Sequence, residues 1–109
     1  MTADELYTIE DEAYRAMASA VCDFDGTGYD GIEAAYQTML KYVAACPDNA
    51  ERTAALSQLL LVRMRAKGYI DIDVLPGIEA ARVYPGDYLT IIRDGLRDVR
   101  MLAVASLYG

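Results

Sequence analysis

The sequence contains no histidine and no tryptophan among its 109 residues, and it has only three prolines and two cysteines. The absence of histidine excludes imidazole general bases, histidine metal sites and every Ser-His or Cys-His catalytic pair. No glycine-rich phosphate loop followed by Lys-Ser or Lys-Thr is present. The cysteines, Cys22 and Cys46, are too few for a disulfide scaffold. We therefore expect no enzymatic activity and no cofactor, and two reduced thiols at opposite ends of neighbouring helices.

Basic residues are also scarce, with ten Lys and Arg against seventeen Asp and Glu, so the formal net charge is −7. Binding to phosphates requires a concentrated Lys/Arg surface, which disfavours direct contact with nucleic acid or with an anionic membrane. The longest uncharged run, residues 53–62, is about half the length that a membrane-spanning helix needs. Residues 1–5 lack the pattern of a signal peptide. These features predict a cytoplasmic protein.

The residues that are present favour helices. Hydrophobic residues make up 54% of the chain and recur at steps of three and four, which places them on one face of each helix. The length suits one domain over residues 1–109. We predict an all-α fold, an antiparallel bundle in which the third and fourth of its four main helices are the closest neighbours. The expected helices cover residues 2–22, 31–45, 49–67 and 87–107.

Capping and breaking residues set the expected helix ends. Thr2 and Glu5 have the spacing of a capping box, and Asp30 and Glu33 form a second such pair. A Gly/Asp-rich loop joins the first two helices. Gly68 is a natural stop for the third helix, and the alternating residues 70–75 predict a short extended segment. A short helix is expected after Pro76, through Glu79 to Val83, because proline suits a first helical turn.

The expected core follows from the apolar stripes. In the third helix, the predicted apolar band includes Leu59, Leu60 and Met64 and should be the most buried element. In the last helix, Gly95 interrupts the pattern, and a helical glycine costs roughly 1 kcal/mol relative to alanine.

The distribution of charge is uneven, and it gives the main functional hypothesis. Residues 1–30 hold eight acidic residues and one basic residue, so the first helix and its loop carry the equivalent of the whole net charge. Nine tyrosines against one phenylalanine add side chains that suit interfaces. We predict a non-catalytic protein-interaction or regulatory module with an acidic, Tyr-bearing surface. The candidate partner-binding residues are Asp4, Glu5, Tyr7, Glu10, Asp11, Glu12 and Tyr14.

A partner for such a surface would be a protein with a basic surface, because opposite charge accelerates encounter. One specific version is an inhibitor that occupies the nucleic-acid-binding groove of another protein. Self-association through apolar faces, giving a homo-oligomer, is an alternative. Arg93, Arg97 and Arg100 share one side of the last helix and form a second candidate interface, for an acidic or phosphorylated partner.

The loop after the first helix suggests two further alternatives. Asp23, Asp25 and Thr27 occupy the first, third and fifth ligand positions of a calcium-binding helix–loop–helix, although the twelfth position is Ala34 and not a glutamate. This pattern predicts at most a weak Ca²⁺ or Mg²⁺ site. Residues 23–27 also resemble the nucleophile motif of haloacid dehalogenase-like phosphatases, which would imply attack by Asp23 on phosphorus. That motif follows a strand, whereas residues 13–21 have a helical pattern.

Overall fold

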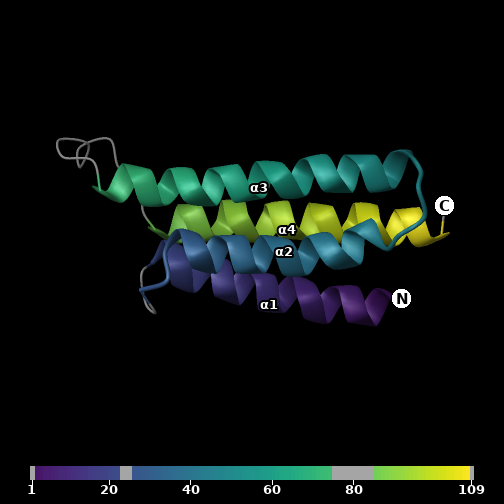
Figure 1. Ribbon diagram of the computed structural model, residues 1–109, viewed down its shortest axis with the longest axis horizontal. Helices are drawn as coiled ribbons and strands as arrows, with labels where there is room; N and C mark the ends of the chain where they lie inside the picture. The colour runs from purple at the N-terminus through teal and green to yellow at the C-terminus, as the bar shows by residue number, and fades with distance from the viewer. Residues whose placement is uncertain (1, 23–25, 75–84, 109) are drawn as a thin grey trace.

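The protein is a bundle of four helices in a computed structural model that describes residues 2–22, 26–74 and 85–108. The helices are α1 (Ala3–Val21), α2 (Tyr29–Ala44), α3 (Ala50–Val74) and α4 (Pro85–Tyr108), and the described ranges contain no strand. Successive helices run in opposite directions, with both ends of the chain at one end of the bundle (Figure 1). The predicted all-α antiparallel bundle is confirmed.

The helices stand at the corners of a square in the order α1, α2, α3 and α4, so that α4 also lies beside α1. Each helix contacts the two helices at the adjacent corners. The α3–α4 pair is the most extensive, followed by α1–α2, α2–α3 and α1–α4, whereas the diagonal helices α1 and α3 barely touch. The prediction that the third and fourth helices are the closest neighbours is therefore confirmed. The interface between α1 and α4 forms the α1–α4 seam, and the interface between α2 and α3 forms the α2–α3 seam.

Helix starts follow the predicted caps only in part. The Thr2 hydroxyl accepts a hydrogen bond from the Glu5 backbone N–H at 3.2 Å, as expected for the cap of α1. The predicted capping pair of Asp30 and Glu33 is wrong, because α2 begins at Tyr29, two residues before the expected start at residue 31, and its cap residue is Gly28 with φ of +52°. No side chain caps this end, and Glu33 instead reaches across to α3.

The largest correction concerns the end of α3. The helix continues through Gly68 to Val74, so the predicted stop at Gly68 and the extended conformation of residues 70–74 are wrong. The continuation is stabilised by packing, since the Tyr69 ring stacks on Tyr88 with centroids 4.1 Å apart and Ile70 packs against the core. Tertiary contacts thus override a local signal for termination. Residue 75 and the helix expected at 79–83 lie outside the described residues.

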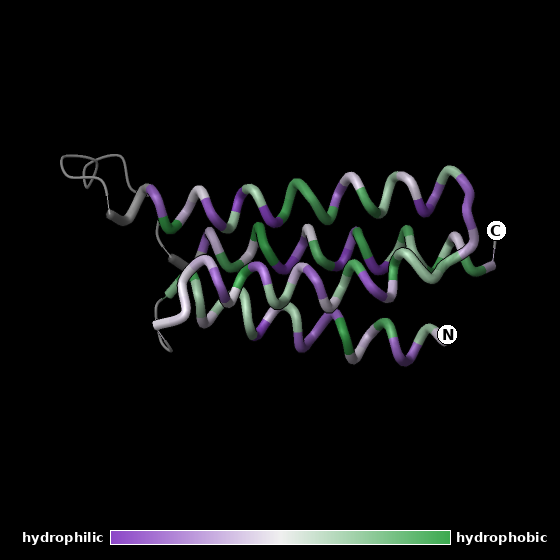
Figure 2. Tube along the Cα trace, viewed as in Figure 1, coloured by the Kyte–Doolittle hydropathy of each residue, from purple (hydrophilic) through white to green (hydrophobic). Residues whose placement is uncertain are grey.

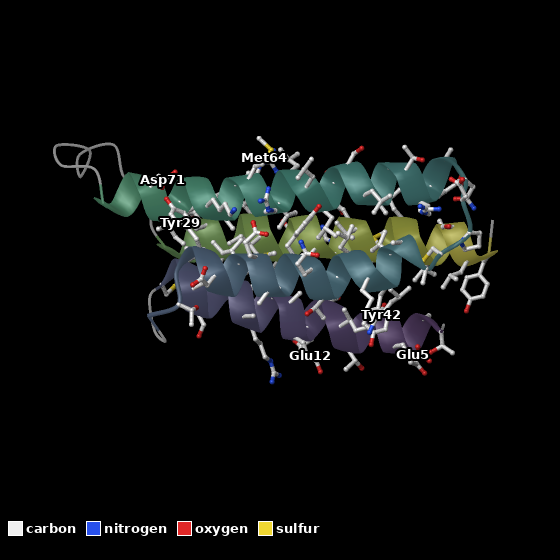
Figure 3. The ribbon with its side chains drawn as sticks, viewed as in Figure 1. Glu5, Glu12, Tyr29, Tyr42, Met64 and Asp71 are labelled. Carbon is white, nitrogen blue, oxygen red and sulfur yellow. The ribbon has the colours of Figure 1, made fainter. Side chains whose placement is uncertain are left out.

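The core is built from the apolar stripes of all four helices, and apolar and polar residues interleave along each of them (Figure 2). Over residues 50–71 of α3, the buried side chains are Ala55, Leu59, Val62 and Ala66. Leu60 and Met64, which the sequence places in the buried band, are instead 43% and 58% exposed. The apolar band is wider than the face that α2 and α4 can cover, and the excess remains on the outer face of the bundle. Figure 3 shows Met64 on that outer face.

Gly95 has a packing role that its helix propensity does not reveal. A Cβ atom at this position would lie 2.5 Å from Val62 Cγ2 on α3, a distance that real Cβ contacts do not reach. The glycine therefore permits the close approach of α3 and α4. Its expected cost to the helix is offset by packing in the most extensive interface of the bundle.

The two cysteines lie where the helix pattern places them. Cys22 follows α1 at one end of the bundle, and Cys46 follows α2 at the other end, so no disulfide joins them. Cys46 is buried, and its thiol donates to the Tyr42 carbonyl oxygen at 3.6 Å. None of the helices in the described ranges combines the length and the apolar character that crossing a bilayer demands.

Candidate interaction surface

The seven predicted partner-binding residues all lie on α1, but they fall on two different sides of it. Tyr7, Glu10 and Tyr14 face α4, where each contacts an arginine or lines a pocket with arginines. The remaining four are exposed carboxylates, of which Glu5 and Glu12 lie on the α2 side and Asp11 lies near the arginines of α4; the four are Asp4, Glu5, Asp11 and Glu12. The structure therefore separates one predicted surface into a seam inside the bundle and an exposed acidic face.

On the α1–α4 seam, Glu10 is neutralised within the chain. Its Oε1 accepts from Arg100 Nε at 3.2 Å, and the two side chains are only 17% and 13% exposed. The guanidinium carbon of Arg100 also lies 4.0 Å from the centroid of the Tyr7 ring, which is a cation–π contact. A partner could engage Glu10 only by breaking this pair, so Glu10 is a poor docking residue.

Two helical turns along the same seam, Arg93 covers Tyr14 at 3.9 Å from its ring centroid. A pocket of about 270 Å³ opens here, lined by Glu10, Asp11, Tyr14, Arg93, Arg97 and Arg100. Arg97 forms ion pairs with Asp94 at 3.5 Å and Asp98 at 4.0 Å, both on its own helix. The predicted arginine face of α4 is therefore brought together, but Arg97 and Arg100 already have carboxylate partners.

The α2–α3 seam repeats this constellation, and sequence reasoning missed it. Glu33 on α2 forms ion pairs with Arg63 and Lys67 on α3. The guanidinium of Arg63 lies 5.2 Å from the Tyr36 ring, and the ammonium of Lys67 lies 5.9 Å from the Tyr29 ring. The Lys67 ammonium and the Arg63 guanidinium hold the pKa of the Glu33 carboxyl below its usual value, although partial burial acts in the opposite direction.

A sequence signal for these seams exists. Tyr7 and Tyr14 are seven residues apart with Glu10 between them, and Tyr29 and Tyr36 have the same spacing around Glu33. Seven residues is two helical turns, so each set lies along one helix edge. The opposing cations recur in the same way, at steps of four or seven: Arg63 and Lys67 on α3, Arg93 and Arg100 on α4.

The exposed acidic face runs along the outer side of α1, with Glu5 and Glu12 toward α2 and Asp11 toward the pocket shared with α4. Asp4 and Glu5 lie in the first turn, and Asp11 and Glu12 follow one heptad later. Asp11 pairs with Arg15 on its own helix at 3.0 Å. Among the described residues, no Lys or Arg forms an ion pair with Asp4, Glu5 or Glu12.

A groove between α1 and α2 lies within this acidic face. It has a volume of about 350 Å³ and is lined by Glu5, Thr8, Ile9, Glu12 and Tyr42. Tyr42 lies between the two glutamates along the bundle axis (Figure 3). Tyr42 was not among the predicted site residues, because it comes from α2 and only the packing of α2 on α1 brings it to the acids.

The alternative cation site stays a prediction. Asp23 and Asp25 lie outside the described residues, and Thr27 lies in the exposed turn before α2. Across residues 2–22, 26–74 and 85–108, no three Asp, Glu or Cys side chains gather closely enough to hold a metal ion.

The described arrangement offers exposed carboxylates and a tyrosine ring, which can form ion pairs and cation–π contacts with a basic surface. It also offers an exposed apolar strip on α3, formed by Leu60, Leu61 and Met64. Comparison with known proteins adds no assignment, since no family model, curated protein or solved structure matches this chain.

Proposed function

We propose that this chain is a non-catalytic protein-interaction module that docks the acidic face of α1 on a basic surface of a cytoplasmic partner protein. The observation that carries the proposal is the contrast between the paired acids of the bundle and the unpaired acids of α1. Glu10 and Glu33 are held by arginines or a lysine on neighbouring helices, whereas Asp4, Glu5 and Glu12 face solvent without a described cation.

The net charge of the whole chain supports docking on a basic partner surface. A net charge of −7, to which α1 contributes five acids against one arginine, raises the rate of encounter with a basic surface and repels other acidic surfaces. Tyr42, which is partly exposed, lies among the exposed acids and provides contact area that charge alone does not. An inhibitor that covers the nucleic-acid-binding surface of its partner is the most specific form of this function.

The test compares two triple variants that remove the same charge. Asp4→Asn, Glu5→Gln and Glu12→Gln neutralise the acidic face of α1, while Glu51→Gln, Asp71→Asn and Asp87→Asn neutralise three acids elsewhere. Both sets include first-turn acids, so their effects on helix capping are matched. The partner is sought by cross-linking and mass spectrometry in the host, with each variant in place of the natural chain.

The expected result is a partner that the natural chain and the control variant retain at low salt and that the α1 variant loses. Binding should weaken steeply as salt rises, because exposed charges are screened over about 10 Å at 0.1 M salt. A partner that the α1 variant retains, or association that salt leaves unchanged, would contradict the proposal.

A second candidate function is self-association, which the exposed strip of Leu60, Leu61 and Met64 on α3 favours. Large apolar side chains gathered on an outer helix face mark interaction surfaces more often than chance exposure does. Light scattering after size exclusion, over a hundredfold range of concentration, tests this directly. If the molar mass of the natural chain equals that of a monomer at every concentration, as it does for Leu61→Glu, self-association is eliminated.

A further inference from the structure

The bundle contains three copies of one constellation in which a cation contacts a tyrosine ring and a carboxylate at the same time, two formed by arginines and one by Lys67 with Tyr29 and Glu33. Arg100 lies on Tyr7 and bonds Glu10 across the α1–α4 seam. Arg63 lies on Tyr36 and bonds Glu33 across the α2–α3 seam. In both arginine cases the guanidinium carbon lies within 5.2 Å of the ring centroid while Nε bonds the carboxylate, and a planar guanidinium can stack on a ring and donate to a carboxylate at the same time.

The groove between α1 and α2 has the ring and the carboxylates of this constellation but lacks the arginine. Tyr42 provides the ring, and Glu5 and Glu12 provide two carboxylates that line the same groove of about 350 Å³. The only described cation near the ring is Lys41, whose ammonium lies 6.0 Å from the centroid, at the outer limit of a cation–π contact. Lys41 forms no ion pair with either glutamate in the described part of the chain.

The dimensions of the groove suit a single planar cation. Glu5 and Glu12 are seven residues apart on one helix, which places their backbones about 10 Å apart along the axis. The side chains can converge from both directions on a group seated over Tyr42, between them (Figure 3). Ile9 contributes an apolar wall that would contact the methylene stem of such a side chain.

We propose that the α1–α2 groove binds an arginine side chain of the partner protein, with the guanidinium stacked on Tyr42 and its N–H groups donating to Glu5 and Glu12. This inference rests on the proposed function and specifies the contact at its centre. The partner's arginine would complete on this face the arrangement that Arg100 and Arg63 complete inside the bundle.

Arginine is expected to bind this groove more tightly than lysine, although Lys67 makes a longer version of the same arrangement with Tyr29 and Glu33. The guanidinium carbons of Arg93, Arg100 and Arg63 lie 3.9, 4.0 and 5.2 Å from their ring centroids. The two lysine contacts of the bundle are longer, at 5.9 and 6.0 Å. A guanidinium is also more weakly hydrated than an ammonium, so moving it from water into a groove costs less free energy.

Three short peptides, identical except for one central residue, test the choice of ligand. The central residue is arginine, lysine or citrulline, which has nearly the shape of arginine but no charge. Binding is followed by NMR through the shifts of the Tyr42 ring and of the Glu5 and Glu12 side chains. The arginine peptide should shift these signals with an affinity at least about fivefold above that of the lysine peptide, which corresponds to about 1 kcal/mol. The citrulline peptide should give no saturable shift.

Variants of the groove locate the contact. Glu12→Gln and Tyr42→Leu should each weaken the arginine peptide severalfold, whereas Tyr42→Phe keeps the ring face and should bind normally. Asp11→Asn removes the same charge as Glu12→Gln from the neighbouring position outside the groove, and should have less than a twofold effect. Lys41→Gln removes a nearby positive charge and should strengthen binding.

The outcomes separate this inference from the proposed function. An oligolysine peptide serves as a probe of the acidic face as a whole. Suppose that oligolysine binds in a salt-dependent manner, but the arginine peptide binds no more tightly than the lysine peptide or binds Tyr42→Leu as well as the natural chain. The groove inference is then wrong, and the acidic face remains a docking surface. If neither peptide binds at low salt, both proposals fail together.

Discussion

Gly95 on α4 faces Val62 on α3 so closely that a Cβ atom at position 95 would lie 2.5 Å from Val62 Cγ2. This contact sets the spacing of the most extensive helix pair in the bundle. A glycine inside a helix is ordinarily a weakness, and here it is a requirement of packing.

Gly95→Ala should therefore destabilise the protein, although alanine is the better helix former. Overpacking of this kind costs about 1–3 kcal/mol, which exceeds the gain of about 1 kcal/mol in helix propensity. Urea denaturation followed by circular dichroism measures the difference. Gly68→Ala is the matched control, since a Cβ there meets open space, and it should stabilise the protein. Adding Val62→Ala to Gly95→Ala should recover part of the lost free energy of unfolding. Equal stability of Gly95→Ala and the natural chain would show that α3 and α4 can move apart without loss of stability.

The buried pair of Glu10 and Arg100 should contribute measurably to stability, unlike the surface pairs of the same helix. Arg100→Gln should lower the free energy of unfolding by about 2 kcal/mol, because it leaves a largely buried carboxylate with a weaker partner. Arg97→Gln removes a half-exposed arginine from the same helix and should cost about 0.5 kcal/mol or less. Denaturant titration of both variants is the measurement. Equal losses would indicate that burial of the α1–α4 pair does not matter.

The ion pairs of Glu33 predict a specific dependence of stability on pH. Because its pKa is lower in the folded chain, the folded state binds this proton less tightly than the unfolded state does. The contribution of Glu33 is thus complete above the unfolded pKa of about 4.3, and it is lost as the pH falls through the lower folded value. Stability curves from pH 7 to pH 2.5 should fall more steeply for the natural chain than for Glu33→Gln. Glu12→Gln, which removes an exposed acid with no described partner, should keep the steep fall.

Cys46 should react slowly with thiol reagents. Burial raises the pKa of its thiol, and the effect of the nearby Arg52 charge in the other direction is smaller. Since the thiolate is the reactive species, both burial and the raised pKa reduce the rate. In Cys22→Ala at pH 8, modification of Cys46 by a disulfide reagent should be much slower in buffer than in denaturant. Modification of Cys46 at the denatured rate in buffer would mean that this end of the bundle opens readily.

The helices and most of the core were predictable because apolar spacing is a local property of the sequence. Leu6, Ile92 and Leu96 are buried as their spacing predicts. The extension of α3 beyond Gly68 was not predictable in the same way, because it depends on the stacking of Tyr69 on Tyr88, a contact between different helices. Local signals determine where a helix can end, and tertiary packing determines where it does end.

In the candidate site too, some features follow from the local sequence and others depend on contacts between helices. The acidic residues of α1 were identified from charge counting, but their division between a seam and an exposed face depends on the position of α4. Glu10 looked like its neighbours Asp11 and Glu12 in the sequence, yet it is neutralised by an arginine ninety residues away. Tyr42 was missed because its proximity to Glu5 and Glu12 depends on how α2 packs on α1.

The α1–α4 seam also has a kinetic consequence. Contacts between α1 and α2, or between α2 and α3, join helices that follow each other along the chain, whereas the bond between Glu10 and Arg100 closes a loop of ninety residues. Closure of a longer loop costs more chain entropy, so we expect this edge to form late in folding. Loosening it should then accelerate unfolding and leave the folding rate nearly unchanged.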